Sequence, residues 1–340
     1  MSSPTADATA NPHLEEALKR LFGKTPPPEV LKGWSAALAN GMSAEAFLAK
    51  IATSPRFPDG RRIGTTFPTG HYYSPVVDPS TVTDYVANNM AAKPSDIAAI
   101  PLPLDAMKEF WIRHQALIAA TPFGEQPNPR LRYYASGGPY PLGDALMLRT
   151  MLHAHRPHRI IEIGSGYSTA CMLDTADEAG LSDLRITCIE PDPRRLRSIL
   201  RPGDEARVTI LDRVVQGIDL EPFRALRAND ILFIDSTHVL KTGSDVHYEL
   251  FHILPVLQPG VLVHFHDCRF PFEYPPSFIF EKNYSWNEAY ALRAFLMWNN
   301  RFQVYFWNTL FTASFPALVR QTFPSMMRNP GSSIWLVVQG

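Results

Sequence analysis

The sequence predicts an α/β protein built around one mostly parallel β-sheet, and three observations on residues 141–340 support this fold class. Short apolar segments alternate with amphipathic helical segments along this part of the chain, as in strand–helix–strand units. The apolar segments are nearly continuous, which is typical of parallel strands that helices cover on both faces. Two such segments at the end of the chain are joined without a helix-length apolar stripe, which indicates an antiparallel edge.

Residues 141–340 are therefore expected to form the main domain, around a sheet of seven strands of which the last is reversed. Strands are expected, in order, at 159–163, 185–189, 208–211, 231–234, 261–265, 302–307 and 334–338. Apolar residues at helical spacing predict helices at 142–152, 168–179 and 287–298. Gly180 closes the second of these helices, as glycine commonly does at a helix C-terminus.

The first 140 residues lack this alternation and are expected to form three further regions. Residues 1–12 are small and polar without periodicity, which predicts a disordered tail. Residues 13–57 carry short apolar stripes at helical spacing, which predict a small helical module. Residues 58–140 are rich in proline and aromatic residues, and they are expected to form an irregular arm or lid with one helix near 103–120.

The module at 13–57 contains the segments LFGKTPPPEVLKGWSAAL and GMSAEAFLAKIATSPRF in this order. These segments resemble the DUF4214 type of helical module, which accompanies sugar-active and secreted-polymer proteins. A plain helical hairpin, used for packing or for homo-oligomerisation, is the alternative interpretation.

Composition limits the classes of binding partner and the cellular compartment that are expected for this protein. The formal net charge of −1 gives no overall field that favours nucleic acid or an anionic membrane surface. The sequence has no apolar run long enough to span a bilayer, and the N-terminus does not resemble a signal peptide. The three cysteines are odd in number and not spaced as a metal or redox motif, which predicts reduced thiols in a cytoplasmic protein.

The first expected strand ends in a glycine-containing segment, Glu162-Ile163-Gly164-Ser165-Gly166, which Tyr167 and Ser168 follow. Glycines at such a turn let the backbone bend sharply and approach a ligand. A dinucleotide-binding loop would have a third glycine where Thr169 stands. An acidic residue before the first glycine suits a cofactor with cationic groups better than a diphosphate, so Glu162 is expected to hold such a group through water.

The second expected strand ends at Glu190, about 20 residues beyond the glycines, where a carboxylate can accept hydrogen bonds from ribose hydroxyls. Together, E-x-G-x-G and this acid resemble the motifs of class I methyltransferases, which bind S-adenosylmethionine (SAM) on a Rossmann-like fold. By this resemblance, Gln216 and Ile218 stand where related enzymes wrap the adenine. The full set of cofactor contacts that it implies is Glu162, Gly164, Ser165, Gly166, Tyr167, Ser168, Glu190, Gln216, Ile218 and Asp235.

Ionisable residues lie at the ends of the fourth and fifth expected strands: Asp235 and His238 come after the fourth, His264 lies in the fifth, and His266 and Asp267 come directly after it. Because the carboxyl ends of neighbouring parallel strands meet at one sheet edge, Asp235, His266 and Asp267 could converge on a divalent metal ion. Oxygen ligands favour magnesium or manganese, and added imidazole favours manganese, iron or zinc. His264 could instead be a core histidine, and Asp235 could contact only the cofactor.

The step from Asp235 to His238, followed by a strand with an acidic end, resembles metal-dependent sugar and macrolide O-methyltransferases. The resemblance implies that Asp235 and Asp267 bind the metal, and that His238 is the general base that deprotonates a substrate hydroxyl. This chain departs from that family at His266, where the family has a second acidic residue.

The segments GHYYSPVVDP, IEIGSGYST, ILFIDSTHVLKTGSDVHYE and HFHDCRFPFEYP together resemble the broad bacterial Methyltransf_24 type. The function that this implies is SAM-dependent, metal-assisted O-methylation of a hydroxylated small molecule or glycosyl group. One alternative is an iron-dependent oxygenase or lyase on the same fold, which the His266-Asp267 pair motivates. Another is a non-catalytic binding or scaffold protein, against which the presence of both Glu162 and Glu190 argues.

Overall fold

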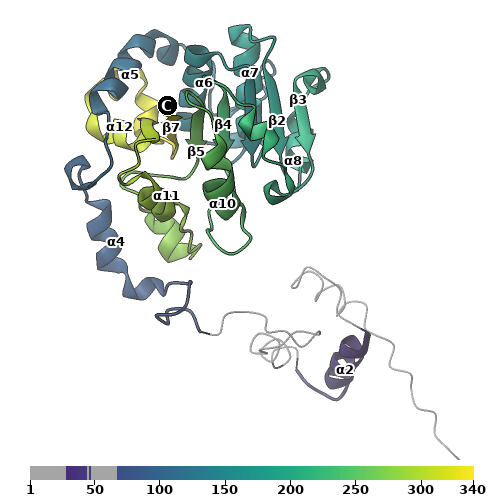
Figure 1. Cartoon of the computed structure of the whole chain (residues 1–340). Helices are drawn as coiled ribbons and strands as arrows, with labels where there is room; N and C mark the ends of the chain where they lie inside the picture. Colours follow the sequence, from purple (N-terminus) through teal and green to yellow (C-terminus); the bar gives the residue numbers. More distant parts are fainter. Residues whose placement is uncertain (1–27, 44–45, 47–66) are drawn as a thin grey trace, which may run out of the picture. The chain divides into compact units, whose positions relative to one another are not determined.

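The computed structural model describes residues 28–43, 46 and 67–340 (Figure 1). The chain divides into two units, residues 1–77 and 78–340, and the second contains the sheet. In the first unit, the described part of the expected helical module contains helix α2 (Pro28–Ala39). The expected tail at 1–12, residues 13–27, 44–45 and 47–57 of the module, and residues 58–66 of the expected arm lie outside the described residues. Within the part of the chain that is described, no helix is both long and apolar enough to cross a lipid bilayer.

The second unit contains a seven-stranded sheet with the strand order β3-β2-β1-β4-β5-β7-β6. Strands β1 to β5 are parallel, and β7 runs antiparallel to both of its neighbours, which confirms the expected reversal. The strands are β1 (Arg159–Ile163), β2 (Arg185–Ile189), β3 (Val208–Leu211), β4 (Ile231–Ile234), β5 (Leu262–Phe265), β6 (Phe302–Trp307) and β7 (Ile334–Val338). The winding direction changes between β1 and β4, and ligands bind in such sheets at this point.

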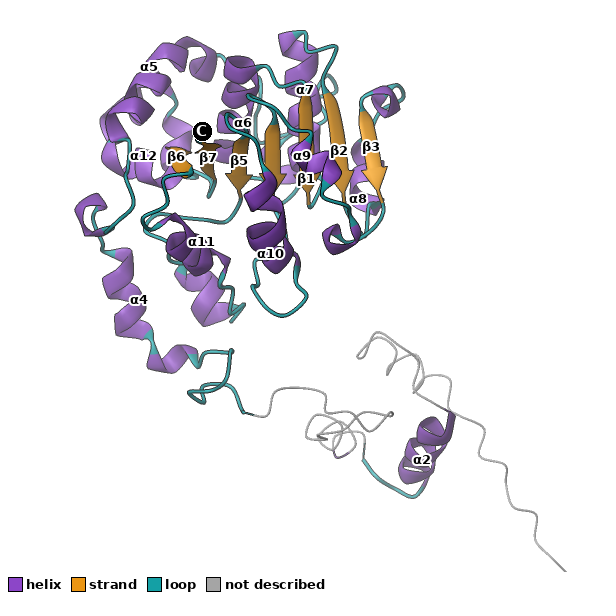
Figure 2. Cartoon of the chain, in the orientation of Figure 1, coloured by secondary structure: helices purple, strands orange, loops and turns teal. Residues whose placement is uncertain are grey.

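Helices surround the sheet (Figure 2). The longer ones are α5 (Leu104–Ala119), α6 (Leu142–His155), α7 (Tyr167–Ala179), α11 (Glu288–Leu296) and α4 (Thr83–Met90). The shorter ones are α8 (Arg194–Ile199), α9 (Glu221–Arg224), α10 (Asp245–Tyr248), α12 (Asn308–Ser314) and α13 (Pro316–Thr322). Single turns complete the unit at Pro79–Thr81, Pro94–Asp96, Ala135–Gly137, Asp204–Ala206, Val215–Gly217, Glu249–Ile253, Leu254–Val256, Ser277–Glu281 and Pro324–Met327.

The connection between β6 and β7 differs from the expected one. It contains α12 and α13, each of seven residues, where no helix was expected. Neither helix is long enough to show a repeated apolar stripe in the sequence, which explains the error. The interior supplies the missing stabilisation, because Leu310 and Phe311 of α12 are fully buried.

The expected arm at 58–140 is also more integrated than the sequence indicates, because residues 78–140 belong to the same unit as the sheet and contain two helices, α4 and α5. Trp111 of α5 is fully buried and stacks on Phe311 at 4.8 Å between ring centroids. Its indole N–H donates to the hydroxyl of Thr322 at 3.1 Å. Helix α5 is therefore part of the main core, and its partners lie some 200 residues away in the sequence.

The segment after α5 is fastened to the domain by Arg132. Its guanidinium lies 2.9 Å from Asp174 of α7 and 2.6 Å from Asp204, and all three side chains are nearly fully buried. Asp174 also accepts hydrogen bonds from the backbone N–H groups of Arg132 and Tyr133, at 2.7 and 2.8 Å. This network fixes the segment that leads to Tyr140, beside the switch point of the sheet.

Candidate functional site

The glycine-containing turn after β1 is packed directly against the end of β4. Gly164 has a φ of +77°, which favours glycine. A Cβ atom at Gly164 would lie 1.9 Å from the carbonyl oxygen of Asp235. The close approach of the ends of β1 and β4 is therefore the first reason why position 164 requires glycine.

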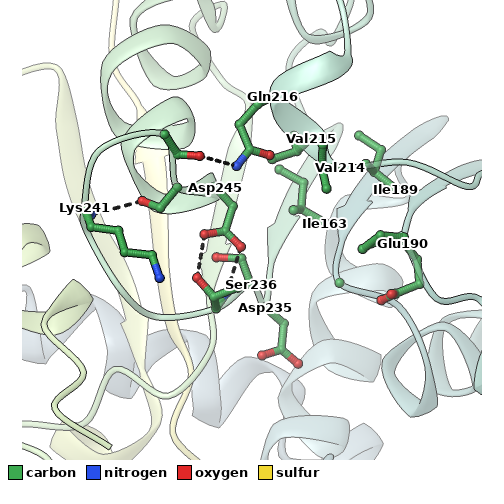
Figure 3. A pocket seen from close by; sticks show the side chains of 15 residues that line it. Ile163, Ile189, Glu190, Val214, Val215, Gln216, Asp235, Ser236, Lys241 and Asp245 are labelled. Atoms are coloured by element: carbon green, nitrogen blue, oxygen red, sulfur yellow. Dashed lines mark hydrogen bonds between the residues drawn. The ribbon is translucent and has the colours of Figure 1, made fainter. Parts of the chain in front are cut away.

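Two adjoining cavities open at this edge of the sheet, with volumes of about 410 Å³ and about 120 Å³. Gly164, Glu190 and Asp235 line both of them. The larger cavity is shown in Figure 3 and is also lined by Val214, Val215, Gln216, Ser236, Lys241 and Asp245, among others. The smaller one is also lined by Tyr140, Ser165, Gly166, Tyr167, Ser168 and Arg195. Most of the residues expected at the cofactor site therefore lie on the walls of one cleft.

Polar groups in this cleft retain unused hydrogen-bonding capacity. The two carboxylate oxygens of Glu190 accept from the backbone N–H groups of Ser165 and Asp192, at 3.2 and 2.8 Å, and each oxygen has a further lone pair. The side-chain amide of Gln216 donates to the carbonyl oxygen of Gly243 at 2.8 Å. Its Oε1 atom and the hydroxyl of Ser165 are buried without a partner among the described residues. Buried polar atoms of this kind are usually satisfied by a ligand or by water.

Glu162 lies behind the turn and lines neither cavity. Its fully buried carboxylate accepts hydrogen bonds from the hydroxyls of Ser168 and Thr169, both at 2.5 Å. Burial raises the pKa of Glu162 to about 7, although these hydrogen bonds oppose the shift. Glu162 thus joins the start of α7 to β1, and its expected contact with a cofactor group through water stays a prediction.

Ile218, an expected adenine contact, lines neither cavity. Its side chain is 8% exposed and belongs to the core, and its carbonyl oxygen accepts from the hydroxyl of Tyr248 at 2.8 Å. The apolar wall in this segment is formed instead by Val214 and Val215, which the sequence analysis missed.

At the inner end of the cleft, the four residues Asp235, His238, His266 and Asp267 form a cluster. Asp235 Oδ1 lies 3.5 Å from His238 Nε2 and 3.4 Å from His266 Nδ1. Asp267 Oδ2 lies 3.8 Å from each of the same two nitrogens. The strand ends therefore bring together the residues that the sequence analysis selected from β4 and β5.

The outward ring nitrogens of both histidines meet buried carboxylates that the sequence analysis missed. His266 Nε2 lies 3.1 Å from Asp144, which is fully buried and also accepts from the backbone N–H groups of Ser332 and Ser333. His238 Nδ1 lies 2.8 Å from Glu288. Neither Asp144 nor Glu288 is near its partner in the sequence, so no local motif points to them.

Charges within the cluster decide its protonation. Burial alone would raise the pKa of Asp235, but the positive charges of His266 and His238 lower it. Burial alone would lower the pKa of His238, but Asp235 and Glu288 raise it to about 10. Asp235 and Asp267 likewise raise the pKa of His266 against the effect of burial. The cluster is thus a set of mutually stabilised ion pairs.

His264 is separate from this cluster. It is fully buried, its Nε2 atom lies 2.7 Å from the hydroxyl of Ser333, and its ring stacks on Phe233 at 3.8 Å. Burial lowers its pKa to about 3. The structure places His264 in the core, which was one of the two interpretations of this residue.

The metal-ligand set that the sequence analysis expected is assembled only in part. Asp235, His266 and Asp267 lie together, but among residues 28–43, 46 and 67–340 no group of three His, Cys, Asp or Glu side chains is arranged to hold a metal ion. The side chains are spaced as ion pairs. The three cysteines are buried and unpaired.

Comparisons with known proteins agree with this architecture. A family model described as a methyltransferase domain matches residues 161–268, from β1 to just after β5. An uncharacterised protein of Archaeoglobus fulgidus is 30% identical over 179 residues, which cover 50% of this chain and 78% of that protein.

Solved structures show weaker similarity. The S-adenosylhomocysteine-bound methyltransferase PaMTH1 of Podospora anserina aligns with 82% of this chain and 100% of its own, at 16% identity and a TM-score of 0.40. The O-methyltransferase TomG of Streptomyces achromogenes, in complex with SAM, aligns over 77% and 96%, at 14% identity and a TM-score of 0.39. On its family-model match and its sheet order, the chain belongs to the class I methyltransferase family.

Proposed function

We propose that this protein transfers a methyl group from SAM to a hydroxyl group of a small molecule or glycosyl acceptor. One observation carries the proposal: Asp235 lines both cavities of the cleft and also contacts both histidines of the cluster. A cofactor bound in the cleft would therefore end beside ionisable groups. This is the arrangement that methyl transfer to a hydroxyl requires, because the attacking oxygen must lose a proton.

The cleft offers groups that match the parts of SAM. Glu190 can accept hydrogen bonds from ribose hydroxyls through its remaining lone pairs. The unpartnered Oε1 atom of Gln216 can accept from an exocyclic amine, between the apolar side chains of Val214 and Val215. The carboxylate of Asp235 adds negative charge where the cationic part of the cofactor would lie. When bound, SAM supplies an activated methyl group on its sulfonium.

We assign the general base to His238. Its Nδ1 atom is held by Glu288, so Nε2 is the ring nitrogen that faces Asp235 and Asp267. In the free protein the neighbouring carboxylates raise its pKa, so the ring is protonated; it can act as the base once positive charge beside Asp235 offsets these carboxylates and Nε2 loses its proton.

The proposal also includes a divalent metal ion, whose participation can be tested. Asp235, His266 and Asp267 would hold it, and their oxygen and nitrogen atoms suit magnesium, manganese or iron in kind. Such an ion would act as a Lewis acid that lowers the pKa of the acceptor hydroxyl. The present spacing of the cluster does not itself form a ligand set.

The test is a methyl-transfer assay with radiolabelled SAM and a panel of sugars, polyols and catechols, with added magnesium or manganese or with chelator. We expect label to appear in at least one hydroxylated acceptor, and its transfer to fall at least about 100-fold in His238→Ala, the usual contribution of a positioned base. Methyl transfer that is undiminished in the presence of chelator would exclude the metal ion from the proposed mechanism. An acceptor that is oxidised or cleaved without gaining label would favour the oxygenase or lyase alternative.

A further inference from the structure

The N-terminus of α11 is built onto the loop that carries His238. The backbone N–H groups of Asn287 and Glu288 donate to the carbonyl oxygen of His238 at 3.1 and 3.2 Å. The side chain of Asn287 bonds both the N–H and the carbonyl of Leu240, at 2.6 and 3.2 Å. His238 has a φ of +60°, which is uncommon for a residue other than glycine. The start of α11 therefore stabilises a loop conformation that is otherwise unfavourable for His238.

The side chain of Glu288 holds the ring of the same histidine. Its Oε2 atom lies 2.8 Å from His238 Nδ1, and the side chains are 4% and 7% exposed. A carboxylate acts as the acceptor in this contact, so the hydrogen is on Nδ1. The indole of Trp286 lies against the imidazole of His238, at 4.3 Å between ring centroids.

His266 is held in the same manner from the opposite side. Asp144 binds its Nε2 atom, which leaves Nδ1 near Asp235 and Asp267. Two imidazoles from different strand ends thus present one nitrogen each to the same pair of carboxylates. Buried carboxylates behind functional imidazoles commonly fix their tautomer and orientation. Asp144 also accepts hydrogen bonds from the backbone N–H groups of Ser332 and Ser333, so it joins two segments of the chain as well. The side chain of Glu288 is hydrogen-bonded to His238.

We propose that Glu288 is a positioning residue for methyl transfer. It fixes the tautomer of His238 with its hydrogen on Nδ1, and it aims Nε2 at the place where the acceptor hydroxyl is deprotonated. Glu288 acts through His238 and does not touch the acceptor. The consequence for catalysis rests on the proposed function, whereas the orientation of the ring does not.

Glu273 provides a matched control. It is also a buried glutamate on the segment after β5, and its exposed fraction is 3%, the same as that of Glu288. Its carboxylate accepts from the side chain of Asn89 and the backbone N–H of Tyr274, both at 3.0 Å, and from the hydroxyl of Tyr290. Glu273→Gln thus removes a buried charge of the same kind without altering the bond to His238.

The experiment records imidazole ¹H–¹⁵N spectra of the full-length protein labelled in histidine, with His238→Gln to assign the signal. In the wild type we expect a slowly exchanging, far-downfield Nδ1 proton from His238. This signal should move upfield in Glu288→Gln, vanish in Glu288→Leu and stay in place in Glu273→Gln. If the leucine variant does not fold, the glutamine variant still decides.

Turnover and cofactor binding complete the test. With the acceptor found in the methyl-transfer panel, Glu288→Gln should lower kcat by about 100-fold or more, while KM and the Kd for S-adenosylhomocysteine change less than about threefold. An unmoved His238 signal in Glu288→Gln, or an equal change in Glu273→Gln, would overturn the proposal. A wild type that does not bind S-adenosylhomocysteine would count against the proposed function and would leave the spectral result valid.

Discussion

Replacement of Gly164 by alanine should destabilise the domain, because the end of β1 has no room for a methyl group. A residue other than glycine pays about 1–2 kcal/mol for a left-handed conformation such as the φ of +77° found here. The added Cβ atom would also lie 1.9 Å from the carbonyl oxygen of Asp235 and 2.8 Å from its carbonyl carbon. Both are backbone atoms, so the end of β4 must move, at about 1–3 kcal/mol for an overpacked interior. The free energy of unfolding should therefore fall by about 2–5 kcal/mol.

Gly124 supplies the control for this prediction. Its φ lies outside the left-handed range, and an added Cβ atom would meet nothing within 4 Å. We expect Gly124→Ala to cost less than about 1 kcal/mol. Urea denaturation of both variants at 25 °C, extrapolated linearly to water, measures the difference. Equal free energies of unfolding for the two variants would refute the reasoning about the strand ends.

Three further predictions concern buried groups. Because the pKa of Glu162 is raised to about 7, the wild type should lose stability as pH rises from about 4.5 through 7, on the order of 3 kcal/mol, and Glu162→Gln should lack this loss; urea midpoints at pH 5 and pH 8 measure it. Arg132→Met should lower the free energy of unfolding by about 3–5 kcal/mol, because it removes the guanidinium that pairs with the buried carboxylates of Asp174 and Asp204, and urea denaturation measures this. Gln216→Ala should weaken the binding of S-adenosylhomocysteine by about 1 kcal/mol in calorimetry without altering the urea midpoint.

Each of these three predictions can be contradicted by a specific result. The same dependence of stability on pH in wild type and Glu162→Gln would show that this carboxyl does not keep its proton on folding. A loss below 1 kcal/mol in Arg132→Met would mean that the ion network adds little. Unchanged affinity in Gln216→Ala would place the adenine elsewhere.

The sheet could be predicted because each strand carries its own signal. Continuous apolar runs such as Ile231–Ile234 need no information from the rest of the chain, and their alternation with helices indicates that the strands are parallel. Helices α12 and α13 could not be predicted, because seven residues are too few to show a period. Helix α5 was predicted, but its place in the core depends on contacts with Phe311 and Thr322 far along the chain.

The candidate site likewise contains residues whose places could be predicted from the sequence and residues whose places could not. Gly164, Glu190 and Asp235 follow strand ends, so their meeting could be inferred from strand order alone. The role of Glu162 in joining α7 to β1 could not be predicted, because the sequence does not show that the hydroxyls of Ser168 and Thr169 would donate to its carboxylate. Glu288 was missed because its contact with His238 spans 50 residues and depends on how α11 packs.

The measurement that tests the central claim most directly is calorimetric titration of the full-length protein with S-adenosylhomocysteine, in the wild type, Glu190→Ala and Asp192→Ala. Asp192 is the control, because its carboxylate is 56% exposed and bonds to Arg194. We expect micromolar binding by the wild type, no change in Asp192→Ala, and a loss of about 1.5–3 kcal/mol in Glu190→Ala, which is about 10- to 150-fold in Kd. Absence of binding by the wild type, or unchanged binding by Glu190→Ala, would contradict the account.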